Sequence, residues 1–128
     1  MNTRLLVTSA GSGTGGNLMR SLRAGTAALT IVGCHDDQFI LKNSAADRDY
    51  LVPPLGHSSW VRAVRGIVEA EKIDLLIPST DADVAAVSRA RARLGAPVFL
   101  PRAATVALCG DKYRLTARLR ASGVPAPA

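Results

Sequence analysis

A glycine-rich loop directly after a short aliphatic run is the feature that most limits how this chain can fold. Residues 4–9 (RLLVTS) are mostly aliphatic and β-branched, which is typical of a strand. The next residues, 10–16 (AGSGTGG), place Gly11, Gly13 and Gly16 in a G-x-G-x-x-G pattern. Glycines permit a tight turn and a close approach of a ligand, and free amide groups at the start of the following helix attract anions. The pattern predicts a strand–loop–helix unit with these three glycines as candidate substrate-binding residues.

Strand-like and helix-like segments alternate along the rest of the chain. Aliphatic runs that predict further strands lie at residues 29–34, 50–52, 73–77 and 97–100. Apolar residues at helical spacing predict helices at 17–24, from 58 or 59 to about 72, at 82–94 and at 112–121, with shorter turns within 35–49 and 102–108. Such alternation predicts an α/β fold, a Rossmann-like doubly wound parallel sheet of about five strands in the order 3-2-1-4-5. Aromatic residues make up only 4% of the chain, so Val, Leu, Ile and Ala must build its core.

Two loops should meet where this strand order reverses, between the first and fourth strands. Ligands of doubly wound sheets bind beyond the carboxyl ends of the strands at that point. The glycine loop follows the first strand, and residues 78–83 (PSTDAD) follow the fourth. Ser, Thr or Asp there can cap the next helix, because their side-chain oxygens accept from its free amide groups. The same groups can hold a substrate amine or hydroxyl, so Thr80 and Asp81 are candidate substrate-binding residues.

The glycine pattern also admits a dinucleotide-binding interpretation. Asp36 follows Gly16 by about 20 residues, the spacing at which an acidic residue binds the ribose of NAD. An NAD(P)-binding domain of a dehydrogenase or epimerase is therefore an alternative function. Any doubly wound domain, however, needs glycines here to pack its helix on the sheet, and nothing after the fourth strand is typical of a nicotinamide site.

Five segments, in order, carry a resemblance to a known family. They are LLVTSAGSGTGGNLMRSLR (5–23), IVGCHDD (31–37), YLVPP (50–54), IDLLIPSTDADV (73–84) and LCGDKYRLTARLRASGVPAP (108–127). Together they resemble the N-terminal (pre-ATP-grasp) domain of ATP-grasp ligases, nearest to the carbamoyl-phosphate-synthase large-subunit-like group. The most specific elements are P-[ST]-[ST]-D-x-[ED] and an Asp-Lys pair followed by a helix and G-[IV]-P-x-P.

The resemblance implies an ATP-grasp ligase as the parent enzyme, with ATP and Mg²⁺ as its cofactors. In such an enzyme ATP activates a carboxylate or bicarbonate as an acyl phosphate, which an amine then attacks. The resemblance gives Lys112 a role in holding the nucleotide phosphates. It also gives Asp83 a substrate contact, although this residue is one methylene shorter than the family's Glu. The family's other residues for ATP and magnesium have no counterpart in this sequence.

The resemblance also predicts how the chain is organised. Residues 1–123 form the pre-ATP-grasp domain, and 124–128 (VPAPA) begin a linker to a C-terminal ATP-grasp domain that is missing. The parent protein would bind a small-molecule carboxylate or amine. The fragment itself has no evident catalytic residue or metal site and is expected to be inactive. Its exposed domain interface allows a homo-oligomer, and a third interpretation is a regulatory or scaffold domain without chemistry.

The net charge of +6 invites, but does not support, a nucleic-acid partner. Basic residues fall at helical spacings without interleaved aromatics, which is typical of solvated helix faces. No apolar run approaches the roughly 18 residues that a membrane span needs, so we expect no membrane partner. Cys34 and Cys109 are interpreted as reduced thiols, and there is no room for a signal peptide before the first strand. These features together predict a cytoplasmic protein.

Overall fold

The structure is a computed structural model that describes residues 1–127. Its strands are β1 (Thr3–Thr8), β2 (Leu29–His35), β3 (Arg48–Leu51) and β4 (Leu75–Ile77). Its helices are α1 (Gly13–Arg23), α2 (Gln38–Leu41), α3 (Trp60–Glu71), α4 (Asp81–Ala90), α5 (Ala103–Cys109) and α6 (Lys112–Ala121), with a 3₁₀ turn η1 (Arg91–Arg93). The strands pair in parallel in the order β3-β2-β1-β4. The α/β class and the Rossmann-like layout of the first four strands are thereby confirmed.

The expected fifth strand, at 97–100, is reduced to a single contact with the sheet. Val98 forms an isolated parallel bridge with Leu76. The Leu76 amide donates to the Pro97 carbonyl at 2.9 Å, and the Phe99 amide donates to the Leu76 carbonyl at 2.8 Å. Pro97 has no N–H to donate, and Pro101 closes the segment, so no ladder can extend from the bridge. The prediction of five strands was wrong in this respect, although the segment does lie beside β4.

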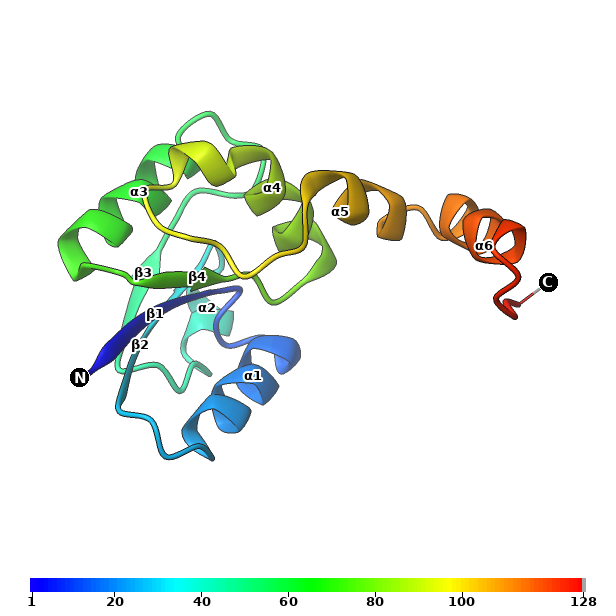
Figure 1. Cartoon of the computed structure of the whole chain (residues 1–128). Coiled ribbons are helices and arrows are strands. Elements are labelled where there is room, and N and C mark those ends of the chain that lie inside the picture. The colour runs from blue at the N-terminus through cyan, green and yellow to red at the C-terminus, as the bar shows by residue number, and fades with distance from the viewer. Residues whose placement is uncertain (128) are drawn as a thin grey trace.

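Helices cover both faces of the sheet (Figure 1), so two separate cores form. On one face Leu6, Val32 and Leu76 pack with residues of α3 and α4, including Val64. On the other face Val7 and Ile31 pack with Met19 and other residues of α1. Successive strand residues therefore point to opposite faces, as the period of a strand requires. This two-sided burial explains why the strands are continuous aliphatic runs.

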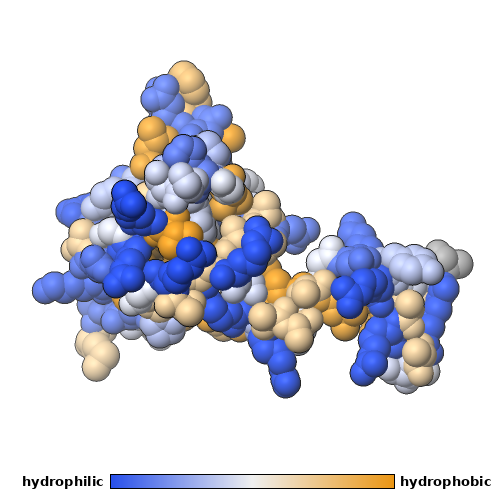
Figure 2. All heavy atoms as spheres, turned by 90° about the horizontal axis from the view of Figure 1, so that it is seen from above, coloured by the Kyte–Doolittle hydropathy of each residue, from blue (hydrophilic) through white to orange (hydrophobic). Residues whose placement is uncertain are grey.

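Helix α5 lies beside α4, and α6 extends away from the body of the domain (Figure 1). Helix α6 lies beyond α5, on the side of α5 away from the sheet, and none of its residues is buried. Figure 2 shows this part of the chain as a separate lobe with many hydrophilic residues. Among the described residues, no helix is both long enough and apolar enough to cross a membrane.

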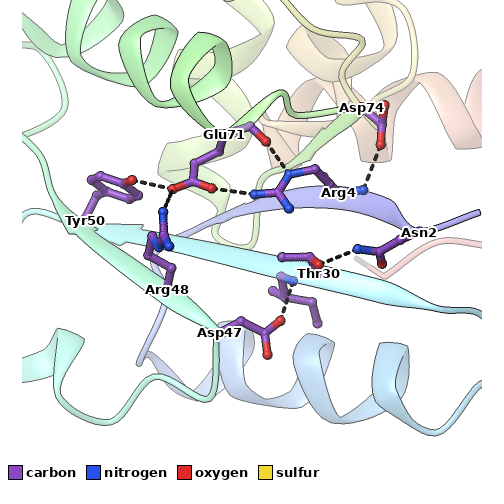
Figure 3. A network of polar contacts seen from close by, with 9 residues as sticks. Asn2, Arg4, Thr30, Asp47, Arg48, Tyr50, Glu71 and Asp74 are labelled. Carbon is purple, nitrogen blue, oxygen red and sulfur yellow. Dashed lines mark hydrogen bonds and ion pairs between the residues drawn. The ribbon is translucent and has the colours of Figure 1, made fainter.

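The amino-terminal end of the sheet is held by a cluster of polar side chains around Glu71, the last residue of α3 (Figure 3). Arg4 of β1 and Arg48 of β3 donate to the two Glu71 carboxylate oxygens at 2.5 and 2.7 Å. The Tyr50 hydroxyl donates to the same carboxylate, and Arg4 Nε also donates to the Glu71 carbonyl. Hydrogen bonds from Tyr50 and Arg48 lower the pKa of Glu71. This Glu71 cluster (Arg4, Arg48, Tyr50 and Glu71) ties α3 to two strands.

Candidate functional site at the carboxyl end of the sheet

The loops after β1 and β4 meet at the carboxyl end of the sheet, as the sequence predicts. The Ser79 hydroxyl donates to the Thr8 carbonyl at 2.7 Å. The Thr8 hydroxyl donates to Asp83 Oδ2 at 2.8 Å, and both side chains are buried. We call Thr8, Ser79 and Asp83 the Asp83 cluster. It joins the last residue of β1 to the first turn of α4.

Residues 78–83, which connect β4 to the first turn of α4, include a helix cap and an exposed carboxylate. Thr80 is the N-cap of α4, and its hydroxyl accepts from the Asp83 amide at 3.1 Å. The capping interpretation of this segment is thereby confirmed. Asp81 is exposed and, with Asp83, places negative charge at the helix start, where free amide groups favour it. Asp83, by contrast, is buried.

The predicted glycines Gly11, Gly13 and Gly16, and their neighbour Gly15, differ in what the fold requires of them. Gly11 has a positive φ of 88°, and a Cβ there would clash with the carbonyl oxygen of Ile40 in α2. A Cβ at Gly15 would lie 2.6 Å from the Ser9 carbonyl oxygen. Gly13 has no atom within 4 Å of that position, and Gly16 meets only the end of a flexible side chain at 3.9 Å. Packing therefore explains Gly11 and Gly15 but not Gly13 or Gly16, which line open space.

A small cavity of about 40 Å³ lies beside the Asp83 cluster, and we call it the inner cavity. Its lining residues come from the carboxyl ends of three strands with the segments that follow them, and from the starts of α3 and α4: Thr8, Ser9, Cys34, His35, Asp36, Val52, Pro53, Leu55, Trp60 and Asp83. Two carboxylates, those of Asp36 and Asp83, are among them, while Lys and Arg are not. His35 is the lining residue able to become cationic. Its Nδ1 accepts from the Asp37 amide at 2.9 Å and lies 3.0 Å from the Asp36 carboxylate.

Carboxylates make the electrostatic environment of this cavity negative, and this environment affects the pKa of the Cys34 thiol. Burial raises the pKa of this thiol to about 12, and the nearby carboxylates of Asp83, Asp49 and Asp36 add to the effect. The thiol is therefore neutral at physiological pH and is a poor nucleophile. Within residues 1–127, no Lys or Arg forms an ion pair with Asp83.

A wider and more open depression adjoins the inner cavity, and we call it the outer hollow. It is lined by Asp36, Asp37, Gln38, Phe39 and Leu51, so Asp36 belongs to both spaces. Phe39 and Leu51 are 68% and 59% exposed, which is high for large apolar side chains. Backbone hydrogen bonds from Ile40 and Phe39 lower the pKa of Asp37, so this side chain is anionic at neutral pH.

Lys112 lies apart from these groups. It is the first residue of α6, it is exposed, and α6 lies on the far side of α5 from the sheet (Figure 1). Its neighbour Asp111 is the N-cap and accepts from the Arg114 amide at 3.0 Å. The structure therefore joins the end of β1 to Asp83 but brings neither Lys112 nor the predicted Gly11, Gly13, Gly16, Thr80 and Asp81 into the lining of the inner cavity.

Several lining residues were not predicted from the sequence as site residues. Thr8, Cys34 and Trp60 lie at the ends of predicted elements, and each was assigned only to a strand or a helix. The signal for Thr8 was its position as a polar residue at the carboxyl end of a strand beside the reversal point. No group of three or more His, Cys, Asp or Glu side chains that could hold a metal ion occurs among the described residues.

No protein-family model and no curated protein matches this sequence. Solved structures do share its fold. L-amino acid ligase from Bacillus licheniformis matches with a TM-score of 0.70 and 16% identity, over 99% of this chain and 32% of that one. The biotin carboxylase domain of 2-oxoglutarate carboxylase from Hydrogenobacter thermophilus, in complex with MgADP, ADP and bicarbonate, matches with a TM-score of 0.68 and 17% identity, over 96% and 28%.

A third enzyme extends this group. Carboxyaminoimidazole ribonucleotide synthase from Aspergillus clavatus, complexed with ATP, matches with a TM-score of 0.59 and 16% identity, over 98% of this chain and 31% of that one. At these identities the likeness concerns the fold alone. The chain is a Rossmann-like α/β unit that spans about a third or less of each of these three enzymes.

Proposed function

We propose that this chain is the N-terminal, substrate-side domain of an ATP-grasp ligase. In the parent enzyme, ATP would activate a carboxylate or bicarbonate as an acyl phosphate for attack by an amine, in the manner of the carbamoyl-phosphate-synthase-like group. The observation that carries the proposal is that the end of β1, directly before the glycine loop, is joined to residues 78–83 at the reversal point of the sheet by the hydrogen bonds from Thr8 to Asp83 and from Ser79 to Thr8. The order and spacing of the resembling motifs support it.

The fold likeness supports the same class. The three similar structures are a ligase, a carboxylase domain and a synthase, and two of them were solved with ATP or MgADP. Each is longer than this chain, so we propose that residues 1–123 are one domain of a larger protein and that 124–128 begin the linker to an ATP-grasp domain. A small-molecule substrate and a homo-oligomeric parent fit this arrangement.

We propose that Thr80, Asp81, Asp83 and the glycine loop form one wall of the substrate site. Thr80 and Asp83 are held in place by the α4 cap and the Asp83 cluster, so this wall is formed before a ligand arrives. Gly13 is exposed at the first position of α1, whereas the Gly16 amide already donates to the Ser12 carbonyl at 2.9 Å.

ATP and Mg²⁺ belong, in this proposal, mostly to other parts of the parent enzyme. Bound ATP would supply the phosphoryl group, with magnesium neutralising its charge. The described residues do not include a metal-binding group of side chains, so we assign them no step that involves magnesium. Lys112 remains the proposed contact for nucleotide phosphates, from its exposed position at the start of α6.

The alternative, an NAD(P)-binding domain, is favoured by the position of Asp36 just after β2. The same glycine loop has a structural explanation, because Ile40 of α2 occupies the space beside Gly11. Gly11 is therefore accounted for without a dinucleotide. Titration calorimetry of the purified chain with NAD and NADP separates the two functions, and micromolar binding of either would overturn our proposal.

The parent enzyme tests the proposal directly. The protein encoded by the complete reading frame should release phosphate from ATP only when magnesium, a carboxylate or bicarbonate, and an amine are all present. The Asp83→Asn variant should lower kcat/KM by about tenfold or more, whereas the matched surface variant Glu69→Gln should not. The chain of residues 1–128 should show no metal-dependent ATP turnover by itself.

A further inference from the structure

We propose that the inner cavity and the outer hollow together bind a primary amine with an apolar body. The ammonium group would lie in the inner cavity between Asp83 and Asp36, and the apolar part would rest on Phe39 and Leu51. This inference rests on the proposed function and deepens it. It assigns the amine, rather than the carboxylate, to the wall that this domain supplies.

Asp83 is the first reason. Its side chain is 3% exposed, and its Oδ2 accepts one hydrogen bond, from the Thr8 hydroxyl. Within residues 1–127 no hydrogen bond to Oδ1 occurs, and no cationic side chain forms an ion pair with this carboxylate. Oδ1 is itself reached by solvent, because no fully buried side-chain oxygen or nitrogen of these residues lacks a hydrogen-bond partner. A buried charge is costly unless it is paired, so the position favours a ligand that brings a positive charge and several N–H donors. An ammonium group has both properties.

The rest of the cavity wall is the second reason. Asp36 adds another carboxylate, and the Cys34 thiol is neutral. A carboxylate ligand would meet two like charges here and, apart from His35, no side chain able to become cationic. A neutral hydroxyl could donate one hydrogen bond to Asp83 but could not compensate its charge.

The size and continuation of the space set the shape of the ligand. A cavity of about 40 Å³ has room for a group of one or two heavy atoms. Anything larger must extend past Asp36, which lines both spaces, into the outer hollow. There the exposed side chains of Phe39 and Leu51 provide an apolar contact. The Lys42 ammonium lies over one face of the Phe39 ring, 5.2 Å from its centroid, so the ligand body would use the rest of that side chain. The arrangement fits a small ammonium head joined to an aromatic or aliphatic body.

The test is a titration of the uniformly ¹⁵N-labelled chain with three probes of similar size, followed by amide NMR. Phenethylamine is the cationic probe, 2-phenylethanol the neutral one and 3-phenylpropionate the anionic one. We expect phenethylamine to bind in the millimolar range or better and at least about tenfold more tightly than either of the others. It should shift amide signals of residues in both spaces, namely Thr8, Cys34, Asp36, Phe39 and Asp83, and leave those of α6 unchanged.

Charge-neutralising variants provide the second arm. Asp83→Asn and Asp36→Asn should each weaken phenethylamine binding by about fivefold or more. Glu69→Gln removes the same charge from an exposed helix position and should leave the affinity unchanged. Asp36 is partly exposed, so its variant keeps the test valid if Asp83→Asn fails to fold. Equal or tighter binding of 3-phenylpropionate would overturn the inference, as would equal losses in Asp36→Asn and Glu69→Gln.

The outcome is separable from that of the proposed function. If neither NAD nor NADP binds and phenethylamine also fails to bind, the amine inference is overturned and the ligase proposal stands. If NAD binds with micromolar affinity, the ligase proposal is overturned whatever the three probes do.

Discussion

The Glu71 cluster and the Asp83 cluster lie at opposite ends of one parallel sheet, and each is built around one buried carboxylate. Glu71 is 4% exposed and Asp83 is 3% exposed. Glu71 accepts from two guanidinium groups and a phenol. Asp83 accepts from one hydroxyl. The amino end thus uses its carboxylate entirely within the fold, whereas the carboxyl end keeps hydrogen-bonding capacity that a ligand can use.

Backbone amide groups, rather than cationic side chains, partly compensate the negative charge of Asp83. Asp83 lies in the first turn of α4, where free amide groups carry partial positive charge. Glu71 lies at the opposite kind of position, the last turn of α3, where carbonyl groups carry partial negative charge. An anion there is unfavourable unless cations surround it, which explains why Arg4 and Arg48 converge on it. The two carboxylates are therefore stabilised by different means.

The largest effect should follow from removing the charge at the amino end. Glu71→Gln leaves two guanidinium groups without their counter-ion, and we expect the melting temperature to fall by roughly 10–20 °C. Thermal unfolding followed by circular dichroism measures this. The matched control is Glu69→Gln, whose carboxylate pairs with Arg65 on the exposed surface and should matter little. Equal melting temperatures for the two variants would show that the Glu71 cluster does not hold the fold.

The next largest effect on stability should distinguish a glycine that packing requires, Gly11, from one that it does not, Gly13. Gly11→Ala adds a Cβ against the Ile40 carbonyl oxygen and forces a positive φ on alanine, so we expect a loss of about 2–3 kcal/mol in the free energy of unfolding. Gly13→Ala meets no neighbouring atom and should change stability by less than about 1 kcal/mol. Urea denaturation of both variants makes the comparison. A Gly11→Ala protein as stable as Gly13→Ala would contradict the packing role.

The pH dependence of stability should show that the Glu71 cluster acts through the charge of its carboxylate. Hydrogen bonds hold the pKa of Glu71 below its ordinary value of 4.5, so its contribution to stability is present above that pH and is lost as pH falls through the lowered pKa. The pKa values of Asp37 and Asp47 are also lowered, but these two residues are present in both the wild type and the Glu71→Gln variant, so they do not contribute to the difference between the two. The difference in melting temperature between wild type and Glu71→Gln should therefore shrink steadily below about pH 4.5. If the difference in melting temperature stayed constant down to pH 2, the destabilisation by Glu71→Gln would come from altered packing and not from the lost charge.

Much of the fold could be predicted from the sequence, because its strands are aliphatic runs separated by helices of clear period. The limits of α6 were predicted to the residue, since Asp111 caps its start and Gly123 follows its end. The fifth strand was not, because an aliphatic run at 97–100 says nothing about which amide groups can join a ladder. Pro97 and Pro101 decided that point through the hydrogen bonds they cannot donate.

The meeting of the segments around the ends of β1 and β4 was predicted, whereas the residues that line the inner cavity were, except for Asp83 and, in the NAD(P) alternative, Asp36, not predicted as site residues. The reversal point of the sheet follows from strand order, so the meeting of the two loops could be expected. The burial of Asp83 and the neutral state of Cys34 depend on packing between distant segments, which no local pattern encodes. The Glu71 cluster did leave a signal. Glu71 follows Ile67 by one helical turn on the apolar stripe of α3, and a carboxylate at such a position requires cationic partners.

The smallest effect on stability should come from Asp83→Asn, and it bears most directly on the comparison. The amide can still accept from Thr8, and the substitution removes a buried charge that no cation compensates. We expect the free energy of unfolding to change by less than about 1 kcal/mol in either direction. Urea denaturation beside Glu71→Gln gives the contrast within one fold. A loss at Asp83 as large as that at Glu71 would mean that both ends of the sheet are structural. A small loss of stability together with weaker amine binding would mean that the Asp83 carboxylate serves ligand binding rather than the stability of the fold.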